Sequence, residues 1–581
     1  MRKRPNPFLA DASRRRFIRD LAVGGVAVGS GLGLAGCGGG DDDDGRPSAT
    51  VSFAHGVASG DPLADRVILW TRATPSSDET LRVRWEVASD TGFSQIVASG
   101  EATTSADADY TVKVDATGLQ PGRSYFYRFR HDQTISPVGR TRTLPTGAVE
   151  RVRMAVFSCS NYPAGYFNVY AAAAQMGDLD VAVHLGDYIY EYERGGYADQ
   201  QAAQLGRESQ PATEIVTLAD YRARHAQYKT DPDLQALHAA VPMIAVWDDH
   251  EVTNDTWKEG AENHQPETER DFVQRRRAAL QAYYEWMPVR QPNPNDPLRI
   301  YRSFDFGTLL SLHMLDTRLI GRDRQHDITS YVGANGSFDI ARFQAEVGAA
   351  DRQLLGAEQA AWLQQRLQAS TATWQVLGQQ VLMGRMSAPA PVLFNLLTGG
   401  QMGVPLQTYF ALLAKQQSAP DTLTPQELAI LAQPALPYNL DAWDGYPAQR
   451  EAVLEMARQA DKNLVVLAGD THNAWASDLA TPGGAAVGVE FATSSVSSPG
   501  FEAYLPNVEP SVLASALQAL IGPLQYAETS RRGFMVVTAT PSECRADWHF
   551  VDTITERNYQ LSLGKSLKVL PGAANRRLVA A

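Results

Sequence analysis

Val183-His184-Leu185-Gly186-Asp187-Tyr188-Ile189-Tyr190 is the stretch that decides how the rest of this sequence is interpreted. A short apolar run from Asp180 to Leu185 ends at a glycine, and Asp187 and Tyr190 follow it. A carboxylate and a phenolate just beyond a buried strand can together hold a metal ion. Taken alone, Asp187 could equally cap the end of a strand, so the evidence must come from other parts of the chain.

Three further apolar runs end in the same way, each followed at once by residues that bind metals. The segments that follow them are Ser158-Cys159-Ser160-Asn161, Trp247-Asp248-Asp249-His250-Glu251-Val252-Thr253-Asn254 and Gly469-Asp470-Thr471-His472. In open α/β sheets, ligands bind beyond the carboxyl ends of the strands. The four segments together therefore predict one metal site at a sheet edge.

The pattern of the chain predicts two kinds of structure. From Arg151 onward, apolar strands alternate with helical segments such as Phe167–Met176 and Leu218–His238, which predicts an α/β architecture. Before that point, Leu81–Val87 and Ser124–Arg130 alternate apolar and polar residues, as half-buried strands do. We therefore expect a small β-sandwich over residues 51–147.

The first 37 residues have the features of an export signal. Ser13-Arg14-Arg15-Arg16-Phe17 matches the twin-arginine pattern. The Gly-rich run that follows is shorter than the roughly 20 apolar residues that span a bilayer, and it ends in Leu34-Ala35-Gly36-Cys37, which resembles a lipobox. Either Cys37 is lipidated and tethers the protein to a membrane, or this is an ordinary cleaved signal. Both readings predict export by the twin-arginine machinery, to the periplasm or cell surface.

Residues 38–50 are rich in glycine and aspartate and predict a flexible linker. The remaining chain is long enough for two or three domains, and at 44% hydrophobic residues it can build a large core. The whole chain has a net charge of −13, which argues against a role in coating nucleic acid. Only Cys159 and Cys544 follow Cys37, so a disulfide framework is not expected.

The ligand types in the four segments favour two unlike metals. A thiolate and a phenolate select a trivalent or softer transition metal, whereas Asp and Asn oxygens suit harder divalent ions. A carboxylate that bridges two cations allows the pair to clamp a phosphoryl group and to activate water. Structural zinc is disfavoured because the paired Cys and His spacings of zinc ribbons are missing from the sequence.

These motifs resemble those of the alkaline phosphatase D (PhoD-like) family of the calcineurin-like metallophosphoesterase superfamily, over most of the mature chain. Besides the four segments, the resemblance rests on the following motifs: His55-Gly56-Val57-Ala58-Ser59-Gly60-Asp61-Pro62, Leu69-Trp70-Thr71-Arg72, Asp316-Thr317-Arg318, Leu355-Gly356-Ala357-Glu358-Gln359, Trp362-Leu363 and Trp443-Asp444-Gly445-Tyr446. It implies a four-layer metallophosphoesterase-like β-sandwich flanked by helices, with a fibronectin-like all-β domain in front. The catalytic domain would span residues 148–560, and residues 561–581 would form a tail.

The resemblance also implies a centre of Fe(III) and Ca(II). Asp187 matches the bridging carboxylate, Tyr190 and Cys159 match iron ligands, and Asp470 and His472 match ligands of the last motif. In the third motif, Asn254 is the first choice for a calcium ligand and Asp249 remains a candidate.

Two further residues have two interpretations each. His250 is either a proton donor or a residue that orients a metal ligand. Arg318 either pairs with phosphate oxygens or forms a structural salt bridge.

The sequence thus predicts an exported phosphoesterase that hydrolyses phosphate esters with a metal-activated water or oxide. A phospholipase D-like activity on lipid headgroups is the alternative, and a catalytically inactive cell-surface binding protein is a third interpretation. Residues 386–436 form an apolar insertion between the motifs. We expect a helical pair packed on the body there, although a lid or a lipid-facing surface would also fit.

Overall fold

The computed structural model describes residues 50–333, 338–397 and 400–581. The predicted signal peptide, Cys37 and the linker up to residue 49 lie outside the described residues. Within those ranges, no helix is both long and apolar enough to cross a membrane.

A ten-stranded sheet forms one half of the central sandwich, in the order β26-β25-β24-β23-β11-β12-β13-β2-β3-β7. At its centre, β11 (Val152–Phe157), β12 (Val181–His184) and β13 (Met243–Ala245) run parallel, and β23 (Arg532–Ala539) and β24 (Cys544–Val551) continue the sheet antiparallel. All residues of β12 are buried, as expected for a parallel strand that is covered on both faces.

A seven-stranded sheet forms the other half, in the order β14-β15-β16-β19-β21-β20-β22. Its strands are β14 (Arg302–Phe306), β15 (Leu310–Met314), β16 (Trp374–Gly378), β19 (Asn463–Ala468), β21 (Ala486–Ala492), β20 (Ala474–Ala480) and β22 (Leu524–Glu528). Val156 and Val183 of the first sheet lie in one buried cluster with Val465 and Phe491 of the second. The two sheets therefore pack face to face around a shared core.

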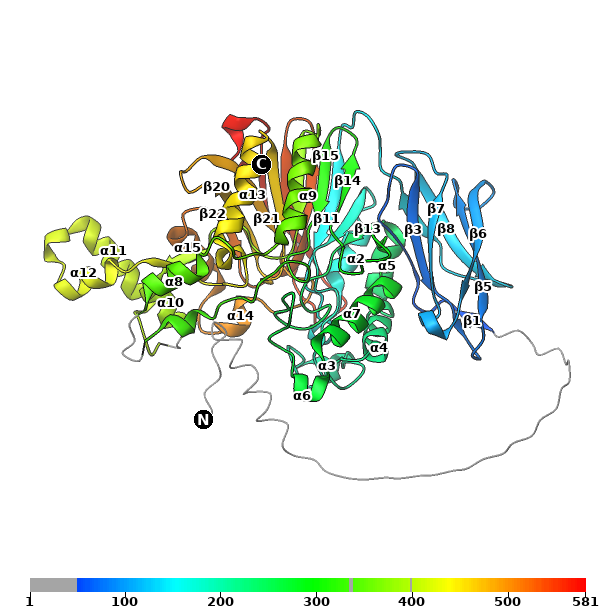
Figure 1. Cartoon of the computed structure of the whole chain (residues 1–581), viewed down its shortest axis with the longest axis horizontal. Helices are drawn as coiled ribbons and strands as arrows, with labels where there is room; N and C mark the ends of the chain where they lie inside the picture. Colours follow the sequence, from blue (N-terminus) through cyan, green and yellow to red (C-terminus); the bar gives the residue numbers. More distant parts are fainter. Residues whose placement is uncertain (1–49, 334–337, 398–399) are drawn as a thin grey trace, which may run out of the picture.

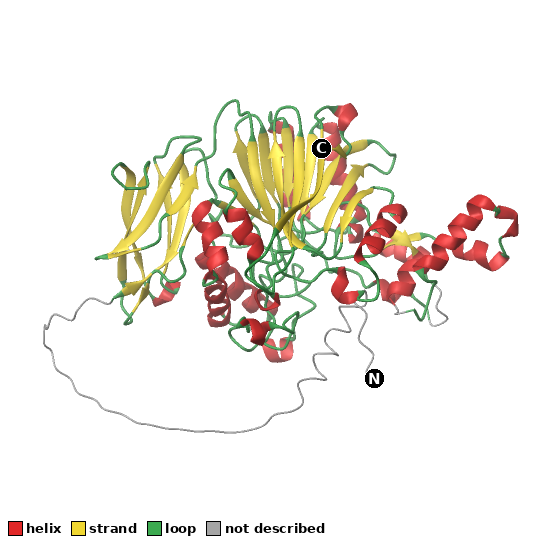
Figure 2. Cartoon of the chain, turned by 180° about the vertical axis from the view of Figure 1, so that it is seen from behind, coloured by secondary structure: helices red, strands yellow, loops and turns green. Residues whose placement is uncertain are grey.

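Helices cover the outer faces of both sheets (Figures 1 and 2). α2 (Asn168–Ala174) and α5 (Pro232–Ala240) contact strands of the ten-stranded sheet, and α4 (Leu218–Lys229) and α7 (Phe272–Trp286) pack beside them. α9 (Gly356–Ala369) and α13 (Pro447–Gln459) cover the seven-stranded sheet. The predicted four-layer α/β fold is thus confirmed.

The helix boundaries follow local sequence signals. The Thr217 hydroxyl accepts from the backbone N–H of Asp220, whose carboxylate accepts from the N–H of Thr217, so a capping box starts α4. Asp231 caps the start of α5, and Pro232 occupies the first turn, where no N–H is needed. These caps fix the residues at which α4 and α5 begin.

The front unit is a β-sandwich, but it shares one sheet with the body. β2 (Val57–Gly60), β3 (Arg66–Arg72) and β7 (Thr111–Thr117) are the last three strands of the ten-stranded sheet, joined to it where Met243 pairs with Gly60. The facing sheet holds β5 (Leu81–Ala88), β6 (Ile96–Thr104), β8 (Ser124–His131), β9 (Thr134–Ile135) and β10 (Gly139–Arg142).

The expectation that residues 561–581 form a tail is wrong. β25 (Leu561–Val569) pairs antiparallel with β24, and β26 (Val579–Ala580) pairs with β25. The alternation of Leu561, Leu563 and Leu567 with polar residues is a strand pattern that the prediction overlooked. Residues 561–581 therefore contribute two strands to the ten-stranded sheet.

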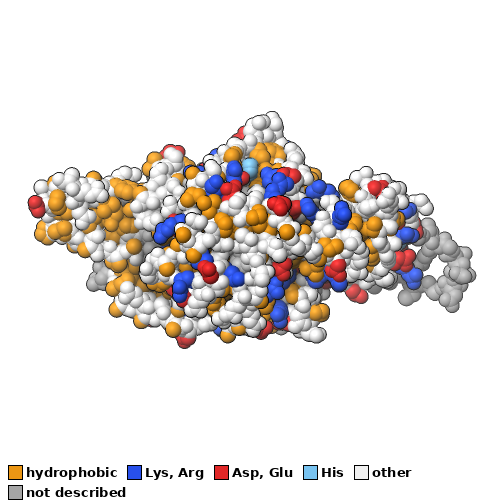
Figure 3. All heavy atoms as spheres, turned by 90° about the horizontal axis from the view of Figure 1, so that it is seen from above, with side chains coloured by type: hydrophobic (Ala, Val, Ile, Leu, Met, Phe, Trp, Pro, Cys, Tyr) orange, Lys and Arg blue, Asp and Glu red, His pale blue; other side chains and the backbone are white. Residues whose placement is uncertain are grey.

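The insertion is helical as expected, but only part of it packs on the body. β17 (Ser387–Pro389) pairs with β18 (Ala435–Pro437) at its base, and Leu393 and Phe394 of α10 (Ala390–Leu397) join a small buried cluster. α11 (Leu406–Ser418) and α12 (Pro425–Leu431), which we call the arm, project away from the sandwich (Figure 1). Hydrophobic side chains gather on the lobe at the left of Figure 3, where the arm lies.

Candidate metal centre

The carboxyl ends of strands from both sheets meet at one place. Cys159 follows β11, Asp187 follows β12 and His250 follows β13, whereas Asp470 and His472 follow β19 of the other sheet. The sheets approach so closely here that a Cβ atom added to Gly469 would lie 2.2 Å from the Ser158 Oγ. Glycine at this position therefore lets the two halves of the site come together.

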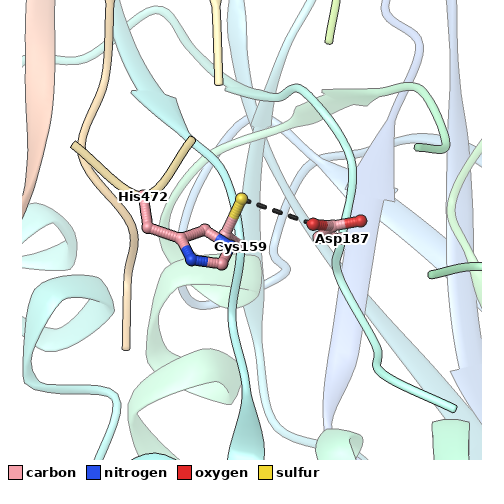
Figure 4. Close-up of side chains that lie close together, drawn as sticks. All are labelled: Cys159, Asp187 and His472. Atoms are coloured by element: carbon pink, nitrogen blue, oxygen red, sulfur yellow. Dashed lines mark hydrogen bonds between the residues drawn. The ribbon is translucent and has the colours of Figure 1, made fainter. Parts of the chain in front are cut away.

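The first ligand group contains Cys159, Asp187 and His472, whose ligand atoms lie within 4.8 Å of one another. Figure 4 shows the three side chains converging, with the Cys159 Sγ 3.5 Å from the Asp187 Oδ2. The Tyr190 Oη lies 3.2 Å from the same carboxylate oxygen and 3.2 Å from the His472 Nε2. Sulfur, phenol, imidazole and carboxylate thus face one common point.

Backbone contacts orient the imidazole of His472. Its Nδ1 lies 2.9 Å from the carbonyl oxygen of Pro499, which can only accept a hydrogen bond, so Nδ1 carries the proton. The lone pair is then on Nε2, the nitrogen that faces Tyr190. A partner on the distal nitrogen fixes a metal-binding histidine in this way.

Two further groups consist mainly of carboxylates. Asp187, Asp249 and His250 form one, and Asp248, Asp249 and Asp470 form the other. The Oδ2 of Asp248 is buried and has no hydrogen-bond partner within the described residues, and the buried Oδ1 of Asp249 has only the Arg318 guanidinium near it, at 3.6 Å. Buried carboxylate oxygens without a partner are costly, so these atoms fit a bound cation.

Burial and mutual repulsion raise the pKa of Asp187 and of Asp470 far above the usual range. Burial, with the nearby Asp187 carboxylate, likewise raises the pKa of the Cys159 thiol. So many negative charges close together need cations to coexist, which again fits the residues to metal ions.

Several residues of the centre have a positive backbone φ angle, which residues other than glycine rarely adopt. Cys159, Asp187, Asp470 and His472 have φ between 54° and 64°, in the left-handed region. Gly186 has φ 111°, and an added Cβ would lie 2.4 Å from the Cβ of Asp248. Strained residues of this kind cluster at functional sites, where surrounding contacts hold them in place.

Glu251 provides one of those contacts. Its buried carboxylate accepts N–H bonds from Asp187 at 3.0 Å, from Tyr188 at 2.6 Å and from Asp248 at 2.6 Å. Burial raises the pKa of Glu251 to about 7, although the N–H donors favour its ionised form. One side chain therefore ties the loop after β12 to the loop after β13.

The backbone on the far side of Tyr190 is held by an arginine. Buried Arg224 of α4 donates through Nη1 to the carbonyl of Tyr190 and through Nη2, at 3.0 Å, to the carbonyl of Tyr192. Arg224 and Glu251 together fix both ends of the loop that carries Asp187 and Tyr190.

His250 is held by a carboxylate rather than pointing freely into the site. Its Nδ1 lies 2.6 Å from the Glu191 Oε2, and both residues are buried. Burial lowers the pKa of His250, but the negative charges of Glu191, Asp249 and Asp248 together raise it to about 9. The His250 ring lies 4.2 Å from the ring of Tyr190, centroid to centroid. His250 thus lies at the edge of the centre, in one of the three ligand groups.

Arg318 lies fully buried among four carboxylates. It contacts Asp248 at 2.5 Å, Asp441 at 2.8 Å, Asp470 at 2.9 Å and Asp249 at 3.6 Å. These charges raise the pKa of Arg318 despite its burial. Arg318 thus forms the salt bridges that one interpretation of the sequence expected, and it lies beside the ligand groups.

The structure brings together Cys159, Asp187, Tyr190, Asp249, His250, Arg318, Asp470 and His472. Asn254 lies next to this cluster: its N–H donates to Glu191 at 2.8 Å, and its amide group donates to Glu262 at 3.3 Å. Asp248, Glu191, Glu251 and Asp441 were missed. The Asp248-Asp249 pair was a visible signal, and Asp441 lies just before the Trp443-Asp444-Gly445-Tyr446 motif.

The fold and the site define a two-sheet α/β metallohydrolase with its ligands at the meeting sheet edges. The family model described as PhoD-like phosphatase matches residues 154–548, and the model of the PhoD-like phosphatase N-terminal domain matches residues 40–145. The chain belongs to the PhoD-like phosphatase family. It is therefore a phosphoric ester hydrolase, and the family is metal-dependent.

Alkaline phosphatase D of Bacillus subtilis (strain 168) is 34% identical over 567 residues, which cover 94% of this chain and 86% of that protein. A solved structure of PhoD is similar over 93% of this chain and 94% of its own, with 34% identity and a TM-score of 0.73.

Proposed function

We propose that the protein is an exported phosphoesterase that uses Fe(III) and Ca(II) to hydrolyse phosphate monoesters or diesters. The observation that supports it best is the asymmetry of the centre around Asp187. A thiol, a phenol and an imidazole lie around the Asp187 carboxylate, whereas the Asp248, Asp249 and Asp470 carboxylates form a separate ligand group. Such a division suits one ferric ion and harder divalent ions.

When bound, the metals would polarise the phosphoryl group and lower the pKa of a water molecule. Cys159, Tyr190 and His472 would hold iron, Asp187 would bridge, and Asp249, Asn254 and Asp470 are the candidates for calcium. Arg318 would bind phosphate oxygens with its guanidinium. His250, kept protonated by Glu191, would give the proton on Nε2 to the leaving oxygen.

Metal analysis and substrate assays test this proposal together. We expect iron and calcium in the purified protein, and turnover of nitrophenyl phosphate or its bis-ester at alkaline pH. An active protein that contains neither metal would contradict the metal assignment. Activity on phosphatidylcholine alone would instead favour the phospholipase D-like alternative, which the projecting arm with its 48% exposed Leu428 supports.

The site also bears on the binding-protein interpretation, because a complete and crowded ligand set is not expected in an inactive protein. Export through the twin-arginine pathway and lipidation of Cys37 are part of the proposal. Mass spectrometry of the mature N-terminus tests them: a diacylglyceryl-modified Cys37 supports the tether, and an unmodified N-terminus contradicts it.

A further inference from the structure

A cavity of about 780 Å³ lies between the front unit and α7. Its volume falls within the roughly 300–1,000 Å³ that is typical of small-molecule sites. β6 and β7 form one wall, α7 forms the opposite wall and residues 291–298 contribute a third side. No lining residue belongs to the three ligand groups of the metal centre, so the cavity is a separate feature.

The walls of the cavity are mainly apolar. Val112 of β7 and Leu280 of α7 are nearly fully buried, and Val273, one α7 turn from Arg276 and Arg277, is 55% exposed. The surface that remains open to a ligand is therefore largely hydrocarbon, which favours an apolar chain over a sugar or a nucleotide.

The charges of the lining are mainly positive. Lys113, Arg276 and Arg277 line the cavity, and none of them makes an ion pair within residues 50–333, 338–397 and 400–581. Of the two lining carboxylates, Glu285 is already paired with Arg222 at 2.7 Å, which leaves Asp296. Cations therefore outnumber anions here, although the whole chain has a net charge of −13.

Lys113 is the deepest of these cations. Its Nζ donates to the carbonyls of Tyr284 and, at 3.2 Å, of Val289, which fixes the amine at the cavity wall. Burial lowers its pKa to about 8, so a bound anion would also favour the charged amine. A buried ammonium group that is satisfied only by carbonyls remains open to a negatively charged partner.

We propose that this cavity binds a single-chain anionic amphiphile, with its hydrocarbon chain between β7 and α7 and its carboxylate or phosphate head attracted by the cationic lining side chains Lys113 and Arg277. This site is independent of the proposed catalysis, since it shares no residue with the metal centre.

Isothermal titration calorimetry with dodecanoate tests the proposal, below micelle-forming concentrations and with inorganic phosphate present to occupy the metal centre. We expect one bound molecule per chain, with affinity decreasing about fourfold for each CH2 group removed from the chain. Dodecylphosphonate serves as a second arm, because it separates a preference for a phosphate-type head from one for a carboxylate. Dodecyltrimethylammonium, which has the same chain and the opposite charge, should bind at least tenfold more weakly.

Two variants locate the binding. Leu280→Trp places a larger side chain in the α7 wall of the cavity and should weaken binding strongly, whereas Leu563→Trp, at a 55% exposed leucine on β25, should not affect it. The Arg277 side chain is exposed, so Arg277→Gln should leave the fold unchanged. This variant should weaken binding about threefold. Arg123→Gln, exposed in the front unit, is its control. Absence of binding, equal affinity for the cationic amphiphile, or unchanged binding in both cavity variants would overturn the proposal.

Discussion

The Oγ of Ser498 lies 2.7 Å from the Oη of Tyr190, and both residues are buried. The same hydroxyl is 3.1 Å from the carbonyl of Cys159, so two acceptors compete for one proton. A metal-bound phenolate is the stronger acceptor because it is anionic. Ser498 thus controls the electron density on the proposed iron ligand.

Ser498→Ala should therefore shift the phenolate-to-iron charge-transfer band to longer wavelength, because a phenolate without this hydrogen bond gives up electron density more easily. Visible absorption spectra of the purified protein measure the shift. Ser497→Ala is the matched control, since the Ser497 hydroxyl donates to the carbonyl of Asn161 instead. Tyr190→Phe should remove the band entirely. A charge-transfer band that does not move in Ser498→Ala argues against the role of Ser498. Absence of the band from the parent protein argues against iron.

Glu251→Gln should weaken metal binding. Glutamine has one acceptor oxygen in place of two, so the N–H groups of Asp187, Tyr188 and Asp248 lose part of their anchor. Loss of such an outer contact typically costs about 10- to 100-fold in metal affinity. Competition with a chelator measures the change.

Glu490→Gln is the control for that variant. Glu490 is equally buried, accepts N–H bonds from Met383 and Gly384, and has a pKa that burial likewise raises to about 7. It lies outside the ligand groups. The Glu490→Gln protein should lose thermal stability but keep its metal affinity. Equal loss of metal in both variants would show that Glu251 acts through general stability only.

Arg318→Met should destabilise the metal-depleted protein, because it leaves carboxylates buried without their cation. Breaking a buried ion pair from one side costs about 3–5 kcal/mol. Urea unfolding measures this loss. Added calcium should restore part of it, since the metals then supply the missing positive charge. If calcium restores nothing, the carboxylates around Arg318 do not bind it.

Glu191→Gln should alter how stability depends on pH. The folded-state pKa of His250, about 9, lies above the ordinary value of 6.5 for a histidine. The pair therefore stabilises the fold fully below pH 6.5 and loses this effect as the pH rises through 9. In metal-depleted protein, the gap in unfolding free energy between parent and variant should be larger at pH 6 than at pH 9.5, by up to about 3 kcal/mol. A constant gap would contradict the proposed ion pair.

The sequence predicted the centre well where ligands follow apolar strands directly. Short segments directly after apolar strands contain Asp187, Cys159, Asp249 and His472, and the preceding strands can be inferred from the sequence pattern. Parallel strands bring such segments to one edge of each sheet, and in the structure the two edges meet. The position of each motif after a strand was sufficient to predict that these four residues lie close together.

The supporting residues could not be predicted in the same way. Ser498 lies in a loop after β21 and Asp441 lies beyond the arm, and each reaches the site only through the tertiary structure. The tail was misjudged because a sheet edge strand with exposed leucines, such as Leu563, is a weak signal. The arm was misjudged because apolar helices predict burial, whereas this pair projects.

The two sheets contribute their ligands from distant parts of the chain. Cys159 and Asp187 are synthesised early, whereas His472 emerges 285 residues after Asp187, and the Pro499 carbonyl that orients it emerges later still. A nascent chain on the ribosome therefore never holds a finished metal site until almost all of it has been translated. Assembly of the proposed metal site must therefore come late in the synthesis of this protein.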